Sequence, residues 1–255
     1  MPMPNIYHQE DGTPSILRKP TVYQELYFYR KSDVLVQLTK VFCERFLPSY
    51  GDRTVDQMVQ AARSVKQNIV EGFTDGQTSV EVEVKLLGIA KGSNQELLED
   101  YMDYLKAHSL SDWHAESQMA QGKARACRTF RESSQSSQSR QLKSSRYNAL
   151  LSFCRAHNDD ADYRPFYHQW TDEEMANTAI CLCHMVDKAM ESYIKKVDRE
   201  FVEEGGIRER MTAARLEMRG SQKQIIEQQA QEIASLKAQI SSLQRELAVL
   251  RGQQR

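Results

Sequence analysis

Apolar side chains recur at intervals of three and four residues along most of this chain, which is the spacing of one face of an α-helix. Six segments show the pattern: 26–46, 54–72, 78–105, 112–130, 171–204 and 207–219. Val80, Val82 and Val84 alternate with glutamates and favour a strand locally, but the longer helical period that follows outweighs this. The pattern therefore predicts an all-α fold.

Changes in composition divide the chain. A low-complexity Ser/Gln segment lies between the fourth and fifth helical patterns and is too polar to bury a core. We predict a flexible arm over 1–20, an antiparallel four-helix bundle over 21–131, a Ser/Gln-rich basic linker over 132–146, a helical suffix region over 147–220 and a coiled coil over 221–255.

Capping residues mark several predicted helix ends. Thr54, Thr78 and Thr171 each stand three residues before a Gln or Glu, which is the spacing of a capping box. Gly72 is placed to end the second helix, and Gly205 to end the helix that begins after Thr171.

The last segment carries a heptad repeat. Ile226, Ile233, Ile240 and Leu247 fall at a, and Gln229, Leu236, Leu243 and Leu250 fall at d. In a parallel, in-register pair the flanking charges attract, Glu232 with Lys237 and Glu246 with Arg251. We predict self-association through Ile226, Ile233, Leu236, Ile240, Leu243, Leu247 and Leu250.

Polar residues interrupt the apolar faces of the second and third helices, in the runs from Arg63 to Gly72 and from Ala90 to Leu97. We predict a structural polar network of Arg63, Asn68, Glu71, Gly72, Gly92, Ser93 and Glu96. In it Arg63 pairs with Glu96, Asn68 bonds across the two helices, and Gly88 and Gly92 allow another helix to approach. The alternative is a binding groove that uses the same polar atoms.

These two runs resemble the signature of a bacterial four-helix-bundle family, first noticed as proteins encoded in intervening sequences of 23S rRNA genes. The family includes the accessory protein of diversity-generating retroelements. The run from Glu204 to Arg210 is similar to a suffix segment that some members carry after the bundle. The resemblance implies a homopentamer and, for the retroelement accessory protein, binding to a reverse transcriptase and RNA. Ile at a with Leu at d instead favours two strands, so the copy number stays open.

Positive charge is concentrated in one segment. The whole chain has a formal net charge of −1, yet residues 121–150 hold seven Lys and Arg against one acid. Dense positive charge is what phosphate contacts need. The candidate nucleic-acid-binding residues are Lys123, Arg125, Arg128, Arg131, Arg140, Lys143 and Arg146. The alternative is a solvated linker that offsets acidic neighbours.

No combination of residues predicts catalysis. Cys181 and Cys183 are two apart on a helix and point to different sides, so core packing is favoured over a shared metal ion. The acid and histidine residues between His157 and His168 favour a solvated loop over an ion site, and phosphate-loop and nucleophile-elbow motifs are absent from the sequence. We therefore expect no enzyme activity, cofactor or metal.

The expected setting is the cytoplasm. The chain opens without a signal-peptide pattern, no apolar run is long enough to cross a membrane, and the five cysteines lack framework spacing. The expected function is a non-enzymatic homo-oligomeric scaffold or accessory protein that binds a partner protein or nucleoprotein. The alternative is an RNA- or DNA-binding accessory of a mobile element that contacts phosphates through residues 121–150.

Overall fold

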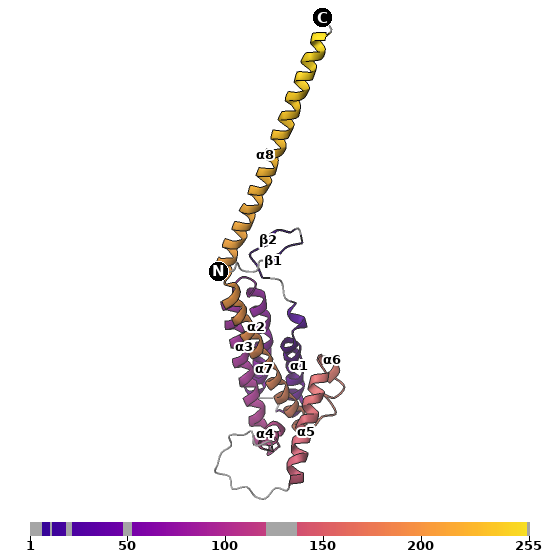
Figure 1. Cartoon of the computed structure of the whole chain (residues 1–255). Helices are drawn as coiled ribbons and strands as arrows, with labels where there is room; N and C mark the ends of the chain where they lie inside the picture. Colours follow the sequence, from indigo (N-terminus) through magenta and orange to yellow (C-terminus); the bar gives the residue numbers. More distant parts are fainter. Residues whose placement is uncertain (1–6, 11, 19–21, 48–52, 121–136, 254–255) are drawn as a thin grey trace. The chain divides into compact units, whose positions relative to one another are not determined.

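The computed structural model describes residues 7–10, 12–18, 22–47, 53–120 and 137–253, and they form an all-α chain, as predicted (Figure 1). Its elements are β1 (Tyr7–His8), β2 (Pro14–Ser15), the 3-10 helix η1 (Tyr23–Glu25), α1 (Tyr27–Phe46), α2 (Arg53–Asp75), α3 (Val80–Ala107), α4 (Trp113–Ala120), α5 (Ser137–Ala156), α6 (Asp160–Tyr163), α7 (Asp172–Glu204) and α8 (Ile207–Gln253). None of the helices in these ranges is long and apolar enough to span a lipid bilayer.

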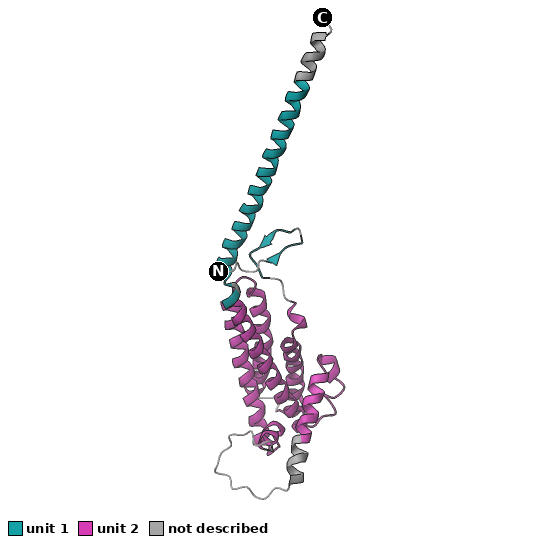
Figure 2. Ribbon diagram, in the orientation of Figure 1, with its two compact units in different colours: residues 1–19, 202–255 teal, residues 20–201 magenta. Residues whose placement is uncertain are grey.

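The chain divides into two units, one of residues 1–19 and 202–255 and one of residues 20–201 (Figure 2). This division differs from the predicted domains. The expected boundary at 132–146 lies inside the larger unit, and α8 continues without a break from the predicted suffix into the predicted coiled coil. The physical reason for the first difference is that α7 joins the same core as the helices before the linker.

The larger unit has one apolar core, to which α1, α2, α3 and α7 all contribute. Fully buried members include Leu38, Phe42, Met58, Ile69, Leu87, Tyr101, Met175, Leu182 and Val186. Polar contacts also join α3 to α7, since Asn94 donates to the carbonyl of Cys183 at 3.0 Å and Tyr193 donates to Glu83 at 2.8 Å. After α1, α2 and α3, the longest helix that packs against this core is therefore α7.

The prediction had placed that fourth helix at 112–130. In the described part of this range the helix is α4, which ends at Ala120, and residues 121–130 lie outside the described residues. Apolar positions are sparse there, whereas α7 buries a continuous face from Met175 to Val186. Apolar content favours α7 for the place in the core.

Helix ends follow the sequence signals in part. The capping box at Thr171 is present, with Glu174 N–H donating to Thr171 Oγ1 at 3.2 Å and Thr171 N–H donating to Glu174 at 2.8 Å. Gly205 ends α7 with φ +76°. The cap of α3 is Ser79 rather than Thr78, and α2 begins at Arg53, one residue before the predicted cap Thr54.

Gly72 does not end α2, which continues to Asp75. It is buried, and a Cβ placed on it would lie 3.4 Å from Leu86 Cβ. The glycine therefore lies in the contact between α2 and α3, where an added Cβ would make ordinary van der Waals contact, and it does not stop the helix.

The stretch between α5 and α7, which the sequence left irregular, is held by two cations of α1. Lys31 is fully buried, and its ammonium donates to the carbonyls of Cys154 and His157 at the end of α5. Arg30 Nε donates to Asp159, the residue before α6, at 2.8 Å. Cations at a helix C-terminus satisfy carbonyls that have no partner within the helix.

In the smaller unit, part of the predicted flexible arm forms a short hairpin. Strands β1 and β2 pair antiparallel, with Tyr7 opposite Ser15 and His8 opposite Pro14. His8 Nε2 lies 2.7 Å from Glu217 Oε1 on α8. The hairpin is held by strand pairing and by this contact with α8. Neither produces an apolar period in the sequence, so the sequence pattern did not predict it.

Candidate functional site

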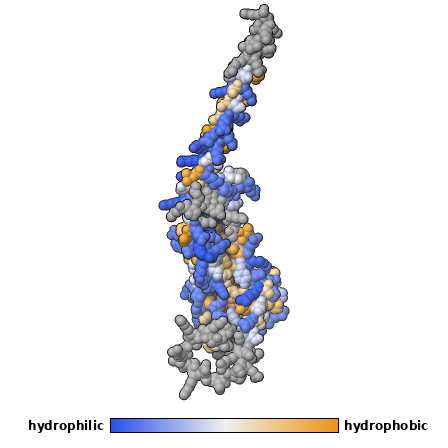
Figure 3. All heavy atoms as spheres, viewed as in Figure 1, coloured by the Kyte–Doolittle hydropathy of each residue, from blue (hydrophilic) through white to orange (hydrophobic). Residues whose placement is uncertain are grey.

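The exposed apolar face of α8 is the most extensive candidate interface among the described residues. Five of the predicted oligomerisation residues have described side chains, and each is exposed by 50% to 64%: Ile226, Ile233, Leu236, Ile240 and Leu243. Figure 3 shows apolar side chains set between polar ones along this helix. The side chains of Leu247 and Leu250 lie outside the described residues, although both stand on α8.

These residues form one stripe because they follow one another at intervals of seven, three, four and three residues. A helix with 3.6 residues per turn places such positions on one face. Ile225, 53% exposed, borders the stripe. Isolated exposed apolar residues are ordinary on protein surfaces, whereas a contiguous row at heptad spacing is the pattern typical of helices that form coiled coils.

The hairpin occupies a separate part of α8. His8 meets Glu217, and the nearby Ala213 and Ala214 are buried. These residues precede Ile226, where the apolar stripe begins. Among the described residues of the smaller unit, the stripe is therefore exposed, while Ala213 and Ala214 near the start of α8 are buried.

The basic segment is only partly within the described residues. Lys123, Arg125, Arg128 and Arg131 lie outside them, and Arg140 and Lys143 stand on α5 with side chains that also lie outside them. Nucleic-acid binding by these residues stays a prediction. Arg146 is the one member of the set whose surroundings the structure describes.

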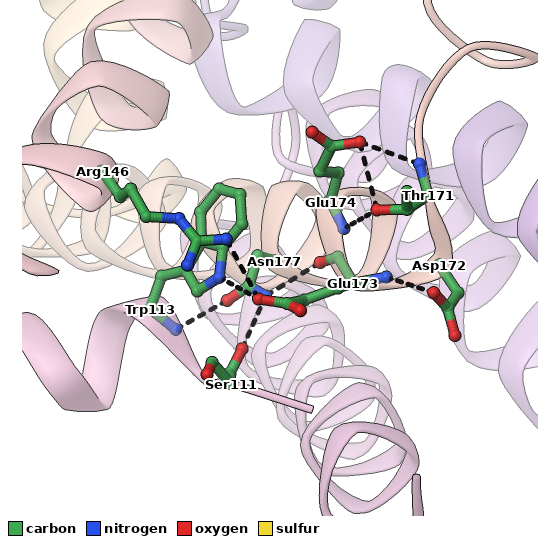
Figure 4. Close-up of polar contacts among 8 residues, drawn as sticks. All are labelled: Ser111, Trp113, Arg146, Thr171, Asp172, Glu173, Glu174 and Asn177. Carbon is green, nitrogen blue, oxygen red and sulfur yellow. Dashed lines mark hydrogen bonds and ion pairs between the residues drawn. The ribbon is translucent and has the colours of Figure 1, made fainter. Parts of the chain in front are cut away.

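Arg146 belongs to a polar cluster at the start of α7 (Figure 4). Its guanidinium carbon lies 4.0 Å from the centroid of the Trp113 ring, and its Nη2 donates to Glu173 Oε1 at 3.2 Å. Trp113 Nε1 donates to the same oxygen at 2.6 Å. Asn177 accepts the backbone N–H of Trp113 at 2.8 Å and donates to the carbonyl of Ser111 at 2.9 Å.

The charge of Arg146 is thus engaged by Glu173 and by the face of Trp113. Its guanidinium is still about half exposed, with 49% of the side chain accessible. The described contacts favour a structural role for this residue, in which it joins α5 to α4 and α7. The sequence did not indicate Trp113, Glu173 and Asn177 as members of this cluster, because contacts between residues so far apart leave no local pattern.

The predicted polar network between α2 and α3 takes a different form from the one expected. The hydroxyls of Ser64 and Ser93 lie 2.9 Å apart and join the two helices. Asn68 Nδ2 donates at 2.8 Å to the carbonyl of Ser64 and at 3.1 Å to its hydroxyl, so it supports this bond from within α2. Ser64 lies in the run from Arg63 to Gly72, but the sequence did not predict its part in the network.

The structure does not bring Arg63 and Glu96 together. Both are exposed, and they line different grooves: Arg63 lies with Lys40 and Glu71, and Glu96 with Ser64 and Ser93. Within one chain, the expected pair is therefore replaced by the serine contact.

Gly88 and Gly92 also depart from expectation. Both are exposed, and a Cβ added to either would meet nothing within 4 Å. The close approach of helices that was expected there occurs at Gly72. The position of a glycine on a helix face, inward or outward, depends on packing that spacing alone does not define.

The two cysteines of α7 and the acidic residues between His157 and His168 take part in packing and in hydrogen bonds within the fold. Cys181 and Cys183 are fully buried. Asp159 caps α6 and binds Arg30, while Asp160 accepts a hydrogen bond from Tyr167 at 2.7 Å. In the described ranges no three His, Cys, Asp or Glu residues are grouped so that they could hold a metal ion.

A histidine contact that the sequence did not indicate joins α4 to α7. The rings of His114 and His184 lie 4.0 Å apart between centroids, in a groove that Asp112 and Asp187 also line. Burial lowers the pKa of both, that of His184 to about 4. Both imidazoles are therefore neutral at pH 7.

No protein-family model, curated protein or solved structure matches this chain. The family resemblance drawn from the two polar runs stays a prediction.

Proposed function

We propose that this protein is a non-enzymatic, homo-oligomeric helical scaffold or accessory protein that binds a partner protein or nucleoprotein. The observation that carries the proposal is the exposed heptad stripe of α8 from Ile226 to Leu243. The larger unit supplies a helical body, and α8 supplies the surface through which copies associate.

The physical argument rests on the free energy of apolar exposure. Burial of apolar surface is favourable by roughly 25 cal/mol per Å². A single copy leaves Ile226, Ile233 and Ile240 more than half exposed. Pairing of two or more α8 helices removes this surface from water, and the covalent link between α8 and the rest of the chain makes each associated copy part of a multivalent particle.

The test measures the mass of the full-length chain by light scattering across a range of concentrations. We expect a multiple of the 29.4 kDa of one chain. The double variant Ile233→Asn/Ile240→Asn should lower that mass, because both asparagines would enter the buried seam. The matched control Ala234→Asn/Ser241→Asn changes the next residue along the helix at each site, on the outward side, and should keep the mass.

Two results would overturn the proposal. The wild-type chain could be a monomer at every concentration, or the Ile233/Ile240 variant could keep the wild-type mass. Deletion of 221–255 separates the sources of assembly: an oligomer that survives the deletion would assign assembly to the rest of the chain, as the family resemblance implies, and would leave α8 for another partner.

Nucleic-acid binding through residues 121–150 remains the second prediction, supported by the charge of that segment alone. It predicts RNA affinity that falls steeply with salt concentration, because phosphate contacts release counterions. The variant Arg125→Ala/Arg128→Ala/Arg131→Ala/Arg140→Ala should lose that affinity. Binding that is absent, or that ignores salt, would exclude this function.

A further inference from the structure

The two sides of the α8 stripe carry opposite charges. In the heptad, position g holds Glu232 and Glu246, and position e holds Lys237 and Arg251. The remaining residues at these positions are uncharged: Ile225, Gln239 and Gln253 at g, and Ala230 and Gln244 at e. Every charge on one border of the stripe is therefore negative, and every charge on the other is positive.

This segregation determines the orientation of a partner helix. In a parallel pair, g of one helix faces e of the other, so acids meet bases. In an antiparallel pair of identical helices, g faces g and e faces e. Any antiparallel alignment of two copies then places Glu232 only beside another acid or an uncharged residue, and Lys237 only beside another base or an uncharged residue.

The same residues select the register. In register, Glu232 faces Lys237 and Glu246 faces Arg251 on both borders of the pair. A shift of one heptad replaces these pairs by Glu232 with Gln244 and Gln239 with Arg251, which are not ion pairs. In register, Gln229 lies opposite Gln229 of the second copy, but the shift places it opposite Leu236. A buried amide beside an apolar side chain lacks a hydrogen-bond partner.

The apolar residues select the number of strands. Isoleucine occupies a at positions 226, 233 and 240, and leucine occupies d at 236 and 243. β-Branched residues at a with leucine at d favour two parallel strands. We infer that a second copy of this chain binds α8 as a parallel, in-register, two-stranded coiled coil from Ile226 to Leu250, a seam of about 37 Å.

The seam has a defined beginning. One heptad earlier, the a and d positions hold Arg219 and Gln222, which do not continue the apolar stripe. The hairpin contact at Glu217 lies before this point and leaves the seam clear. Because the strands are parallel, residues 1–220 of both copies attach to the same end of the coil, which makes the particle bivalent for any partner that those residues bind.

This inference rests on the proposed function, and a cross-linking experiment separates the two. In full-length protein carrying Cys127→Ser, the substitution Ile226→Cys places one thiol at the start of the seam. The four native cysteines that remain are buried. With oxidised glutathione, two facing thiols form an intermolecular disulfide and release two molecules of glutathione, which needs the Cβ atoms about 4 Å apart. We expect a covalent dimer on non-reducing gels.

The matched control is Ser242→Cys in the same background, at the outward position c, which should give little covalent dimer. A particle with twice the chain mass that fails to cross-link through Ile226→Cys would overturn the parallel register and leave the scaffold proposal intact. A mass of three or more chains would overturn the two-stranded assignment alone. A monomer would overturn both.

Charge reversal provides an independent readout in the wild-type cysteine background. Glu232→Lys places two lysines opposite each other on both borders of a parallel pair, and we expect the dimer dissociation constant to rise roughly three- to tenfold at low salt. Glu232→Lys/Lys237→Glu restores opposite charges and should recover most of the affinity. In an antiparallel pair Glu232→Lys would face Glu246 and strengthen binding, so tighter association of the single variant would overturn the inference.

Discussion

Arg146 and Trp113, which stand on either side of residues 121–136, are stacked on each other and bind one carboxylate oxygen. The guanidinium lies 4.0 Å from the ring centroid, and both side chains donate to Glu173 Oε1. Helices α4 and α5 are therefore both tied to the first turn of α7 through these two side chains. The N-terminus of a helix is a favourable place for this carboxylate, since the helix dipole is positive there.

Removal of the charge on Glu173 should destabilise the larger unit. Glu173→Gln preserves the shape of the side chain but weakens two hydrogen bonds that depend on the carboxylate, and only 23% of the Glu173 side chain is exposed. We expect a loss of about 1–2 kcal/mol in the free energy of unfolding, because hydrogen bonds to charged groups are the stronger ones. Urea unfolding followed by tryptophan fluorescence measures it.

The matched control is Glu191→Gln on the same helix. Glu191 is 48% exposed and binds Lys195 one turn away at 2.5 Å. Exposed pairs of this type contribute little, so we expect a much smaller change than for Glu173→Gln. Equal effects of the two substitutions would contradict a special role for Glu173.

The contact between His114 and His184 should make stability depend on pH. Burial and the neighbouring His114 lower the pKa of His184 to about 4, while Asp112 and Asp187 oppose the shift. The unfolded chain takes up a proton near pH 6.5, and the folded chain resists it until about pH 4. The free energy of unfolding should therefore fall as the pH drops through this window, by about 2–3 kcal/mol from His184.

The variant His184→Phe tests this origin, because it keeps a ring beside His114 and removes the titrating group. Urea unfolding at intervals from pH 7 to pH 4 should give a shallower slope for the variant than for the wild-type chain. His114 has a lowered pKa as well and contributes in the same window, so some slope should remain. An unchanged slope would show that other groups cause the acid sensitivity.

Local periodicity was enough to predict most helices of this chain. Apolar spacing of three and four located α1, α2, α3 and α7 to within a few residues, since one buried face per helix imposes that spacing. It did not identify the fourth long helix of the core. That choice depends on which apolar face packs against the others, and α7 lies beyond the predicted Ser/Gln linker, of which residues 137–146 belong to α5.

The polar contacts were less predictable than the helices. Charge suggested that Arg63 binds Glu96, yet the α2–α3 contact uses Ser64 and Ser93. Successive residues of a helix point about 100° apart. An error of one residue in which positions face inward therefore assigns the wrong contact partner to every side chain. The α8 stripe could be predicted well because its heptads repeat the same signal several times.

Three glycines near the α2–α3 junction should respond differently to alanine. At Gly76 an added Cβ would lie 2.6 Å from the carbonyl oxygen of Gly72 and 2.8 Å from a Glu83 oxygen, so Gly76→Ala should cost about 1–3 kcal/mol. At Gly72 the nearest atom is at 3.4 Å, which is ordinary contact, and Gly72→Ala should be close to neutral. Thermal or urea unfolding measures each change.

Gly88 supplies the control, because a Cβ there meets nothing within 4 Å. Gly88→Ala should stabilise α3 by roughly 0.5–1 kcal/mol through the lower entropy of the unfolded chain. From most to least stable, we expect the order Gly88→Ala, Gly72→Ala and Gly76→Ala. A Gly76→Ala variant as stable as Gly88→Ala would show that the turn after α2 adapts to the methyl group.

The buried Lys31 should matter through the two carbonyls that its ammonium caps. Lys31→Met keeps the length of the side chain but removes the donor to Cys154 and His157, and Tyr163 then remains the donor to His157 at 3.1 Å. We expect a loss of about 1–3 kcal/mol at pH 7.

Burial also lowers the pKa of Lys31. The folded chain therefore releases this proton at a lower pH than the unfolded chain, and raising the pH toward 10.5 relieves the cost of the buried charge. Urea unfolding of both proteins at pH 7 and pH 10 should show wild-type stability gaining on the variant as the pH rises, and a constant difference would contradict this assignment.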